Sequence, residues 1–235
     1  MAPSEHSSKQ YDIDLEALRS RVLEMGGVVE AQILAAINGL MEGDLEALDN
    51  VIVNDHRVNA LEVSIDTDCS HLIARRQPAA GDLRMVLAVI KIVTDLERIG
   101  DEAAKIARMG KRGLSRAGLP ITPLAAVRHV GDIAIRMLRK ALDALARLDP
   151  VAAAAIVRED VAIDEEFRSI VRQLITFMME DPRTISQALE IVWIAKAIER
   201  IGDHSKNMAE QVIYIVKGTD VRHTSVEDLE REALG

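Results

Sequence analysis

The chain has 235 residues and a formal net charge of −9; 49% of its residues are apolar, but only 2% are aromatic. The acidic balance argues against a nucleic-acid partner, because phosphate backbones are bound by basic faces. A single cysteine, Cys69, excludes an intrachain disulfide. The N-terminus lacks the pattern of a signal peptide, and no run of about 18 apolar residues could cross a membrane. We therefore expect a cytoplasmic protein with no membrane insertion.

The first half of the chain reads as three long helices. Apolar residues recur at spacings of three and four from Leu15 to Leu40, which predicts an amphipathic helix of roughly 30 residues. Gly43 and Asp44 predict a helix stop and the N-cap of a second helix over about 45–76. After a break near the proline at position 78, a third helix runs to about residue 109. Residues 11–110 therefore form one unit, preceded by a polar tail at 1–10.

The second half repeats this pattern after a linker rich in glycine, proline and basic residues at 111–122. Helices are expected over about 123–147, 150–179 and 181–216, and the last begins with Asp181 as N-cap and Pro182 at the first helical position. The second unit thus spans 123–216, and a polar, loosely held tail spans 217–235.

The predicted fold class is all-α, with two tandem three-helix bundles. A helix of about 30 residues is about 45 Å long, so the molecule should be elongated. Long apolar periodicity also fits an intermolecular coiled coil, but the regularly placed glycine and proline breaks favour bundles.

A five-residue helical motif occurs twice, 102 positions apart. Glu97 to Asp101 and Glu199 to Asp203 both read Glu-Arg-Ile-Gly-Asp. The two carboxylates of each copy lie one turn apart on the same helical face, where like charges repel by about 0.2–0.5 kcal/mol. A bound cation would relieve this repulsion.

Acidic pairs also occur on the preceding helix of each unit. Counting residues from the turn of each helical hairpin places Asp55 level with Asp101, and Asp160 level with Asp203. Clusters of oxygen ligands suit Mg²⁺, Mn²⁺ or iron ions. The predicted metal ligands of the second unit are Glu199, Asp203, Asp160, Asp164 and Asn207; those of the first are Glu97, Asp101, Asp55 and Asn59.

The two predicted sites differ in quality. Asn207 extends the second by one further turn, whereas Lys105 occupies the corresponding place in the first and should weaken it. The competing interpretation is a solvated face, in which Asp101 pairs with Lys105 and Arg98 with Glu102 at i, i+4. Two further features occur once each. The pair Asp68 and His71 has no counterpart in the second unit, and Trp193 lies in an apolar run that we expect to be core.

The repeated segments DLERIGD and AIERIGD, with RQPAAGDLR at 76–84, resemble the PhoU family of bacterial phosphate-transport regulatory proteins. The resemblance covers residues 11–216 and implies two tandem three-helix bundles. It also implies multinuclear metal clusters held by E(D)xxxD motifs, here Glu97, Asp101, Glu199, Asp203, Asp160 and Asp164. Asn59 and Lys105 depart from that pattern.

The resemblance further implies a regulatory role rather than an enzyme. Members of the family act between the phosphate ABC transporter and a sensor histidine kinase, suppress the phosphate-starvation response and associate as homodimers. The expected partners are thus the kinase, the transporter ATPase subunit and a second copy of the chain. The alternatives are a ferritin-like dinuclear carboxylate enzyme, a metal-free helical scaffold and a regulator of another ion transporter. The chain has no Glu-x-x-His, the motif on which the enzyme alternative depends.

Overall fold

The computed structural model describes the backbone of residues 5–76, 78, 80–117 and 121–235, and the side chains of 13–75, 78, 81–114 and 124–235. Every regular element in these ranges is helical. In chain order the elements are α1 (Glu5–Glu42), α2 (Leu45–Arg76), α3 (Ala80–Ala117), α4 (Ile121–Arg147), α5 (Pro150–Glu180), the short 3₁₀ helix η1 (Pro182–Thr184), α6 (Ile185–Lys217) and α7 (Val226–Leu234).

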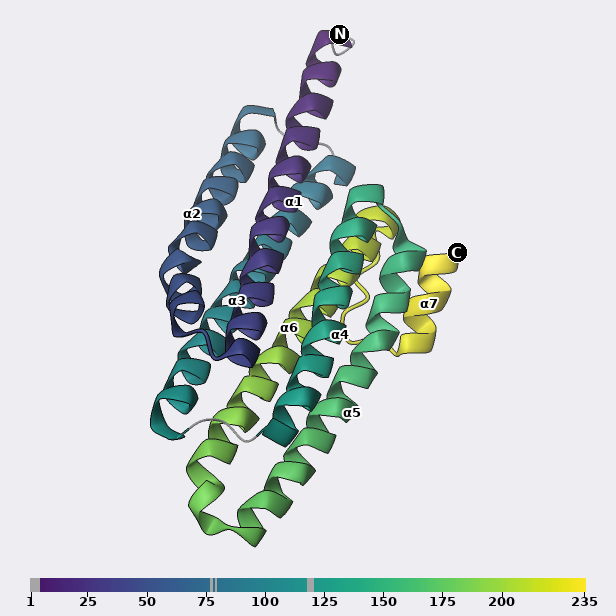
Figure 1. Cartoon of the computed structure of the whole chain (residues 1–235). Helices are drawn as coiled ribbons and strands as arrows, with labels where there is room; N and C mark the ends of the chain where they lie inside the picture. Colours follow the sequence, from purple (N-terminus) through teal and green to yellow (C-terminus); the bar gives the residue numbers. More distant parts are fainter. Residues whose placement is uncertain (1–4, 77, 79, 118–120) are drawn as a thin grey trace.

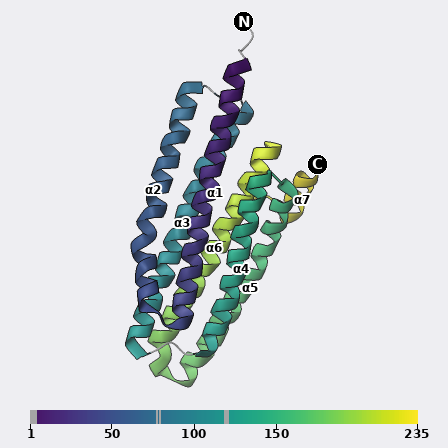
Figure 2. The ribbon, with the colours of Figure 1, turned by 45° about the horizontal axis from the view of Figure 1, so that its top comes forward.

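The six long helices run alternately up and down along one axis. Helices α1 to α3 form one bundle and α4 to α6 the other, and α3 and α6 lie side by side where the bundles meet (Figures 1 and 2). The long helices contain 27 to 38 residues, which corresponds to about 40–57 Å. The predicted all-α fold of two three-helix bundles in an elongated molecule is confirmed. Within the described ranges, none of the helices contains an apolar stretch that could cross a membrane.

One hydrophobic core runs through both bundles. Its fully buried side chains come from all six long helices, among them Met25, Ile65, Ile99, Met137 and Ile201. Helices α3 and α6 pack antiparallel, since the α3 partner advances from Asp95 to Arg112 while the α6 partner recedes from Asn207 to Glu190. The tandem units therefore share a core.

Helix ends follow the capping residues that the sequence predicts. Gly43 has a φ of 71°, and the Asp44 carboxylate accepts from the Ala47 amide at 3.0 Å. Asp181 accepts from the Arg183 amide and starts η1, which leads into α6. Each cap satisfies amide groups that the first helical turn leaves unpaired.

The predicted linker is wrong over most of its length. Helix α3 continues through residues 111–117 and α4 begins at Ile121, while 118–120 lie outside the described residues. Gly110 admits a neighbour instead of ending the helix: a Cβ there would lie 2.8 Å from Leu40 Cδ1. At the next residue, Lys111 Nζ donates to the Asp49 carboxylate at 2.5 Å. Contacts with neighbouring helices thus allow α3 to continue beyond Gly110.

Both predicted tails also contain structure. The backbone of residues 5–10 belongs to α1. At the other end, the prediction of a loose tail over 217–235 is wrong, because α7 packs against α5 (Figure 1). Ser225 caps α7 by accepting from the Asp228 amide, and Leu229 and Ala233 are buried.

Trp193 is the clearest exception to the expected core. Its side chain is 52% exposed, whereas Ile191 and Ile194 beside it are fully buried. The apolar run of α6 is wider than the face that the neighbouring helices cover. Trp193 falls on the uncovered side.

Candidate acidic metal sites

The glycine of each repeated motif faces an aspartate of the preceding helix. A Cβ on Gly100 would lie 3.5 Å from Asp55 Oδ1, and a Cβ on Gly202 would lie 3.6 Å from Asp160 Oδ1. The missing side chain lets α3 approach α2, and α6 approach α5, at the height of the two motif carboxylates. The level pairing of Asp55 with the first motif and Asp160 with the second is therefore observed.

In the first unit four carboxylates gather between α2 and α3. We call Asp55, Glu62, Glu97 and Asp101 the first acidic cluster. Burial raises the pKa of Glu97, and the charges of Asp101, Glu62 and Asp55 raise it further. Burial likewise raises the pKa of Asp101, with Asp55 as the second cause. The negative charges of these carboxylates repel one another, so ionising all of them at once is unfavourable.

A side chain from α1, the helix of this bundle that does not contribute a carboxylate, completes this cluster. Gln32 of α1 is 8% exposed, and its Nε2 donates to Asp55 Oδ1 at 2.8 Å. Its other amide atom, Oε1, is buried without a hydrogen-bond partner among the described residues. That oxygen would lie 3.4 Å from a Cβ on Gly100, so it borders the cluster. An unpaired buried carbonyl is costly, and a cation would satisfy it.

Glu62 takes the role that the sequence assigned to Asn59. Asn59 is exposed, and the charge that acts on Glu97 from this part of α2 is that of Glu62. Glu62 lies seven residues after Asp55, two helical turns along the same face. An i, i+7 search from Asp55 would have found it.

Lys105 does not enter the first acidic cluster. Its Nζ donates to Glu102 Oε2 at 3.1 Å, and the other oxygen of Glu102 accepts from Arg200 of α6 at 2.9 Å. The predicted pairing of Asp101 with Lys105 is thus replaced by a contact at the α3–α6 interface. Lys105 gives no reason to rank the first cluster below the second.

In the second unit three carboxylates gather between α5 and α6. We call Asp160, Glu199 and Asp203 the second acidic cluster. Burial raises the pKa of Asp203, and Glu199 and Asp160 raise it further. This cluster contains its own cations: Lys206 Nζ donates to Asp160 Oδ2 at 2.9 Å, and Lys196 Nζ bonds Glu199 Oε1.

Two predicted ligands of the second unit have partners outside the second acidic cluster. Asn207 Nδ2 donates to Asp95 Oδ1 of α3 at 3.3 Å, and His204 Nδ1 lies 2.8 Å from the same oxygen. Asp164 faces Arg168, with 3.8 Å between Oδ2 and Nη2. Because helices α3 and α6 pack closely, the polar face of α6 that contains Asn207 is directed at α3 instead of α5.

The donor chemistry of both clusters fits a hard cation. All their side chains offer carboxylate or amide oxygens, the ligands that Mg²⁺ and Ca²⁺ prefer. Over the described side chains, no group of three His, Cys, Asp or Glu residues already stands in metal-binding geometry. Binding would therefore require the mutually repelling carboxylates to turn toward the ion.

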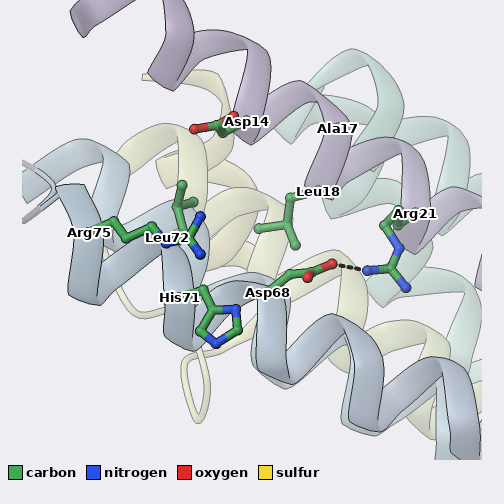
Figure 3. A pocket seen from close by; sticks show the side chains of 8 residues that line it. All are labelled: Asp14, Ala17, Leu18, Arg21, Asp68, His71, Leu72 and Arg75. Atoms are coloured by element: carbon green, nitrogen blue, oxygen red, sulfur yellow. Dashed lines mark hydrogen bonds and ion pairs between the residues drawn. The ribbon is translucent and has the colours of Figure 1, made fainter.

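A separate hollow lies between α1 and α2, toward the outer end of the first bundle (Figure 3). It encloses about 410 Å³. In it Asp68 forms an ion pair with Arg21 of α1, which also donates to Ser64 at 2.8 Å. Asp68 is thus engaged by α1, and no bond joins it to His71.

A buried acid near the C-terminal end of α6 has an unusual pKa. Burial raises the pKa of Glu210 from 4.5 to about 7, and Asp220 and Asp95 add to the rise, while Lys206 and Arg222 oppose it. The folded chain therefore binds this proton more tightly than the unfolded chain. The stability that protonation contributes is present below about pH 4.5 and is lost as pH rises through about 7.

Replacing Glu210 by glutamine should make the protein more stable at pH 8, by about 1–3 kcal/mol, and leave it nearly unchanged at pH 5. Urea unfolding followed by circular dichroism at both pH values measures this difference. Glu227→Gln, at an exposed position of α7, is the control and should show no such dependence. Equal effects of Glu210→Gln at the two pH values would contradict the assignment.

Comparisons of sequence and of structure with known proteins both point to the PhoU family. The family model for the PhoU domain matches twice, at residues 22–109 and 127–212. The chain is 50% identical over 231 residues to a Burkholderia protein named "Phosphate-specific transport system accessory protein PhoU homolog", covering 97% of this chain and 98% of that one. It is 43% identical to the accessory protein PhoU of Escherichia coli K12, covering 99% and 95%.

Two crystal structures share the fold. PhoU from Pseudomonas aeruginosa superposes with a TM-score of 0.86 at 44% identity, covering 89% of this chain and all of that one. The phosphate transport system regulatory protein PhoU from Streptococcus pneumoniae gives 0.83 at 27% identity, covering 90% and 99%. Both family matches fall within the two three-helix bundles.

Proposed function

Because this chain belongs to the PhoU family, we propose that it is a regulatory adaptor of phosphate homeostasis that negatively regulates phosphate uptake and the phosphate-starvation response. The observation that carries the proposal is similarity over nearly the whole chain to phosphate-specific transport system accessory proteins. The relatives' names support an association with the phosphate transport system.

The adaptor would link two partners in the cytoplasm. We propose that the chain contacts the sensor histidine kinase of the phosphate regulon and the ATPase subunit of the phosphate ABC transporter, and that it acts as a homodimer. A rigid double bundle with one continuous core supports this role, since it holds two docking surfaces at a fixed separation. The role is regulatory rather than catalytic.

Metal binding is the second part of the proposal. A cation held between α2 and α3 would neutralise carboxylates that otherwise repel, and would fix that hairpin. The unpaired Gln32 Oε1 and the raised pKa of Glu97 support this role. The repeated motif would then serve to stabilise the shape that the partners recognise.

Co-purification tests the adaptor role. The tagged chain, expressed in a bacterium that also expresses the kinase and the transporter ATPase subunit, should retain both partners at high phosphate and less of them under starvation. An unrelated acidic helical protein with the same tag controls for non-specific retention. Failure to retain either partner in both conditions would overturn the proposal.

A further inference from the structure

We propose that the two repeats treat cations differently: the first acidic cluster, with Gln32, binds a divalent cation, whereas Lys196 and Lys206 take the place of that cation by balancing two of the three carboxylates of the second acidic cluster. The inference rests on the proposed metal role but on none of the proposed protein partners. It departs from the symmetry that the duplicated motif implies.

The repeats can be compared position by position. The family matches begin at residues 22 and 127, so the first two helices of the units are offset by 105 positions, and the motif helices by 102. With these offsets Lys196 corresponds to Thr94, and Lys206 corresponds to Ala104. Both cations of the second cluster are therefore absent from the first.

In the second unit the lysines are held where an ion would otherwise neutralise the carboxylates. Lys206 Nζ lies 2.9 Å from Asp160 Oδ2, and Lys196 bonds Glu199 while its Nζ lies 5.4 Å from the centre of the Phe167 ring. Charge attraction and a cation–π contact together fix the Lys196 ammonium group. Two of the three carboxylates thus have a direct ammonium partner through one oxygen each, while the other oxygen of Glu199, Oε2, is buried without a hydrogen-bond partner among the described residues.

The first unit has oxygen donors where the second has apolar groups. Glu62 corresponds to Phe167, and Gln32 corresponds to Met137 of α4, which is fully buried. The first unit therefore has an additional carboxylate and an additional amide, whose Oε1 lacks a partner in the described structure. These two substitutions add ligands of the kind that a hard cation binds.

The charges of the two clusters differ accordingly. The first has four carboxylates, and the guanidinium groups that act on them through space are those of Arg98 and Arg108. Arg98 lowers the pKa values of Glu62 and Glu97, and Arg108 lowers that of Asp101, but neither makes an ion pair with a cluster carboxylate in the described structure. The second has three carboxylates and two ammonium groups in contact with them. Adding a divalent cation there would place it beside two positive charges, which disfavours binding.

Counting bound Mn²⁺ tests the inference. The full chain is stripped with EDTA and titrated with Mn²⁺, and the free ion is measured by electron paramagnetic resonance. Glu97→Gln with Asp101→Asn should abolish the binding, whereas the matched double variant Glu199→Gln with Asp203→Asn should leave it unchanged. Thermal unfolding without metal establishes that both variants are folded.

Two further variants test the cause of the asymmetry. Lys196→Thr with Lys206→Ala gives the second cluster the residues of the first and should create an additional Mn²⁺ site. Lys196→Arg with Lys206→Arg keeps the charges and should not. Gln32→Met, which copies the second unit, should weaken Mn²⁺ binding by about tenfold, the usual lower effect of losing a group that orients a ligand.

The contrary outcomes are distinct. Loss of Mn²⁺ binding in the Glu199–Asp203 variant, or equal losses in both double variants, would overturn the asymmetry. No Mn²⁺ bound by the parent chain would overturn the metal role altogether. Neither result bears on whether the kinase and the transporter ATPase subunit co-purify with the chain. Failure of the adaptor role would therefore be detected by the co-purification experiment alone.

Discussion

Replacing Ile99 by alanine is expected to lower the free energy of unfolding by about 2–5 kcal/mol. Ile99 is the central residue of the first Glu-Arg-Ile-Gly-Asp motif, and its side chain is completely buried. Removing three carbon atoms leaves a cavity in a core that six helices surround, so the structure can relax only in part. Urea unfolding followed by circular dichroism measures the change.

The same experiment tests whether the two bundles unfold together. Ile201 is the matching residue of the second motif and is equally buried, so Ile201→Ala should displace the same single transition by a similar amount. Ile175→Ala, at a position that is 47% exposed, is the control and should change stability by no more than about 0.5 kcal/mol. Two separate transitions, each sensitive to one motif, would contradict the continuous core.

Replacing Lys206 by methionine is the second change with a large expected effect. It leaves the carboxylate of Asp160, whose side chain is 9% exposed, without its ammonium partner. Removing one member of a buried pair costs about 3–5 kcal/mol; because the Lys206 side chain is one-third exposed, we expect about 2–3 kcal/mol. Chemical denaturation in the presence of EDTA measures the loss.

A surface ion pair provides the matched control. Lys140 Nζ lies 2.5 Å from Glu159 Oε1, but both side chains are well exposed. Lys140→Met should therefore cost no more than about 1 kcal/mol. If the two lysine variants were equally stable, Lys206 would not be neutralising a buried charge. Adding Mn²⁺ should restore part of the stability of Lys206→Met and none of that of Lys140→Met.

The level pairing of the helices was predictable because it depends only on counting. The helical rise is constant, so residues equally distant from a hairpin turn lie at equal height, and Asp55 and Asp160 meet their motifs as counted. The glycine between the two motif carboxylates could also have been interpreted from sequence, since small residues allow close helix approach.

Rotation about the helix axis was not predictable in this way. Height does not tell which neighbour a polar side chain faces, and Asn207 faces Asp95 of the other bundle instead of Asp160 of its own. Asn59 is exposed, and the charge of Glu62, two turns beyond Asp55, is the one that raises the pKa of Glu97. Gln32 was missed because it lies on α1. A search restricted to the hairpins α2–α3 and α5–α6 ignores α1 and α4.

Helix ends were predictable where a capping side chain sets them and unpredictable where packing does. Asp44 and Asp181 cap as expected. Gly110 directly follows the residue at which the third helix was expected to end, yet the helix continues and Gly110 makes room for Leu40. The polar C-terminal segment folds because Leu229 and Ala233 reach the side of α5, a contact with no local sequence signal beyond the Ser225 cap.

In the polar contacts between α3 and α6, the acidic and the hydrogen-bond-donating side chains come from different helices. At the centre of this interface α3 supplies the acids, Asp95 and Glu102, whereas α6 supplies their partners, Arg200, His204 and Asn207. Two copies of the second half alone would bring Arg200 against His204 with no acid between them. The second half is thus complementary to the first and not to itself, so a chain cut between α3 and α4 would not replace the first half by a second copy of the other.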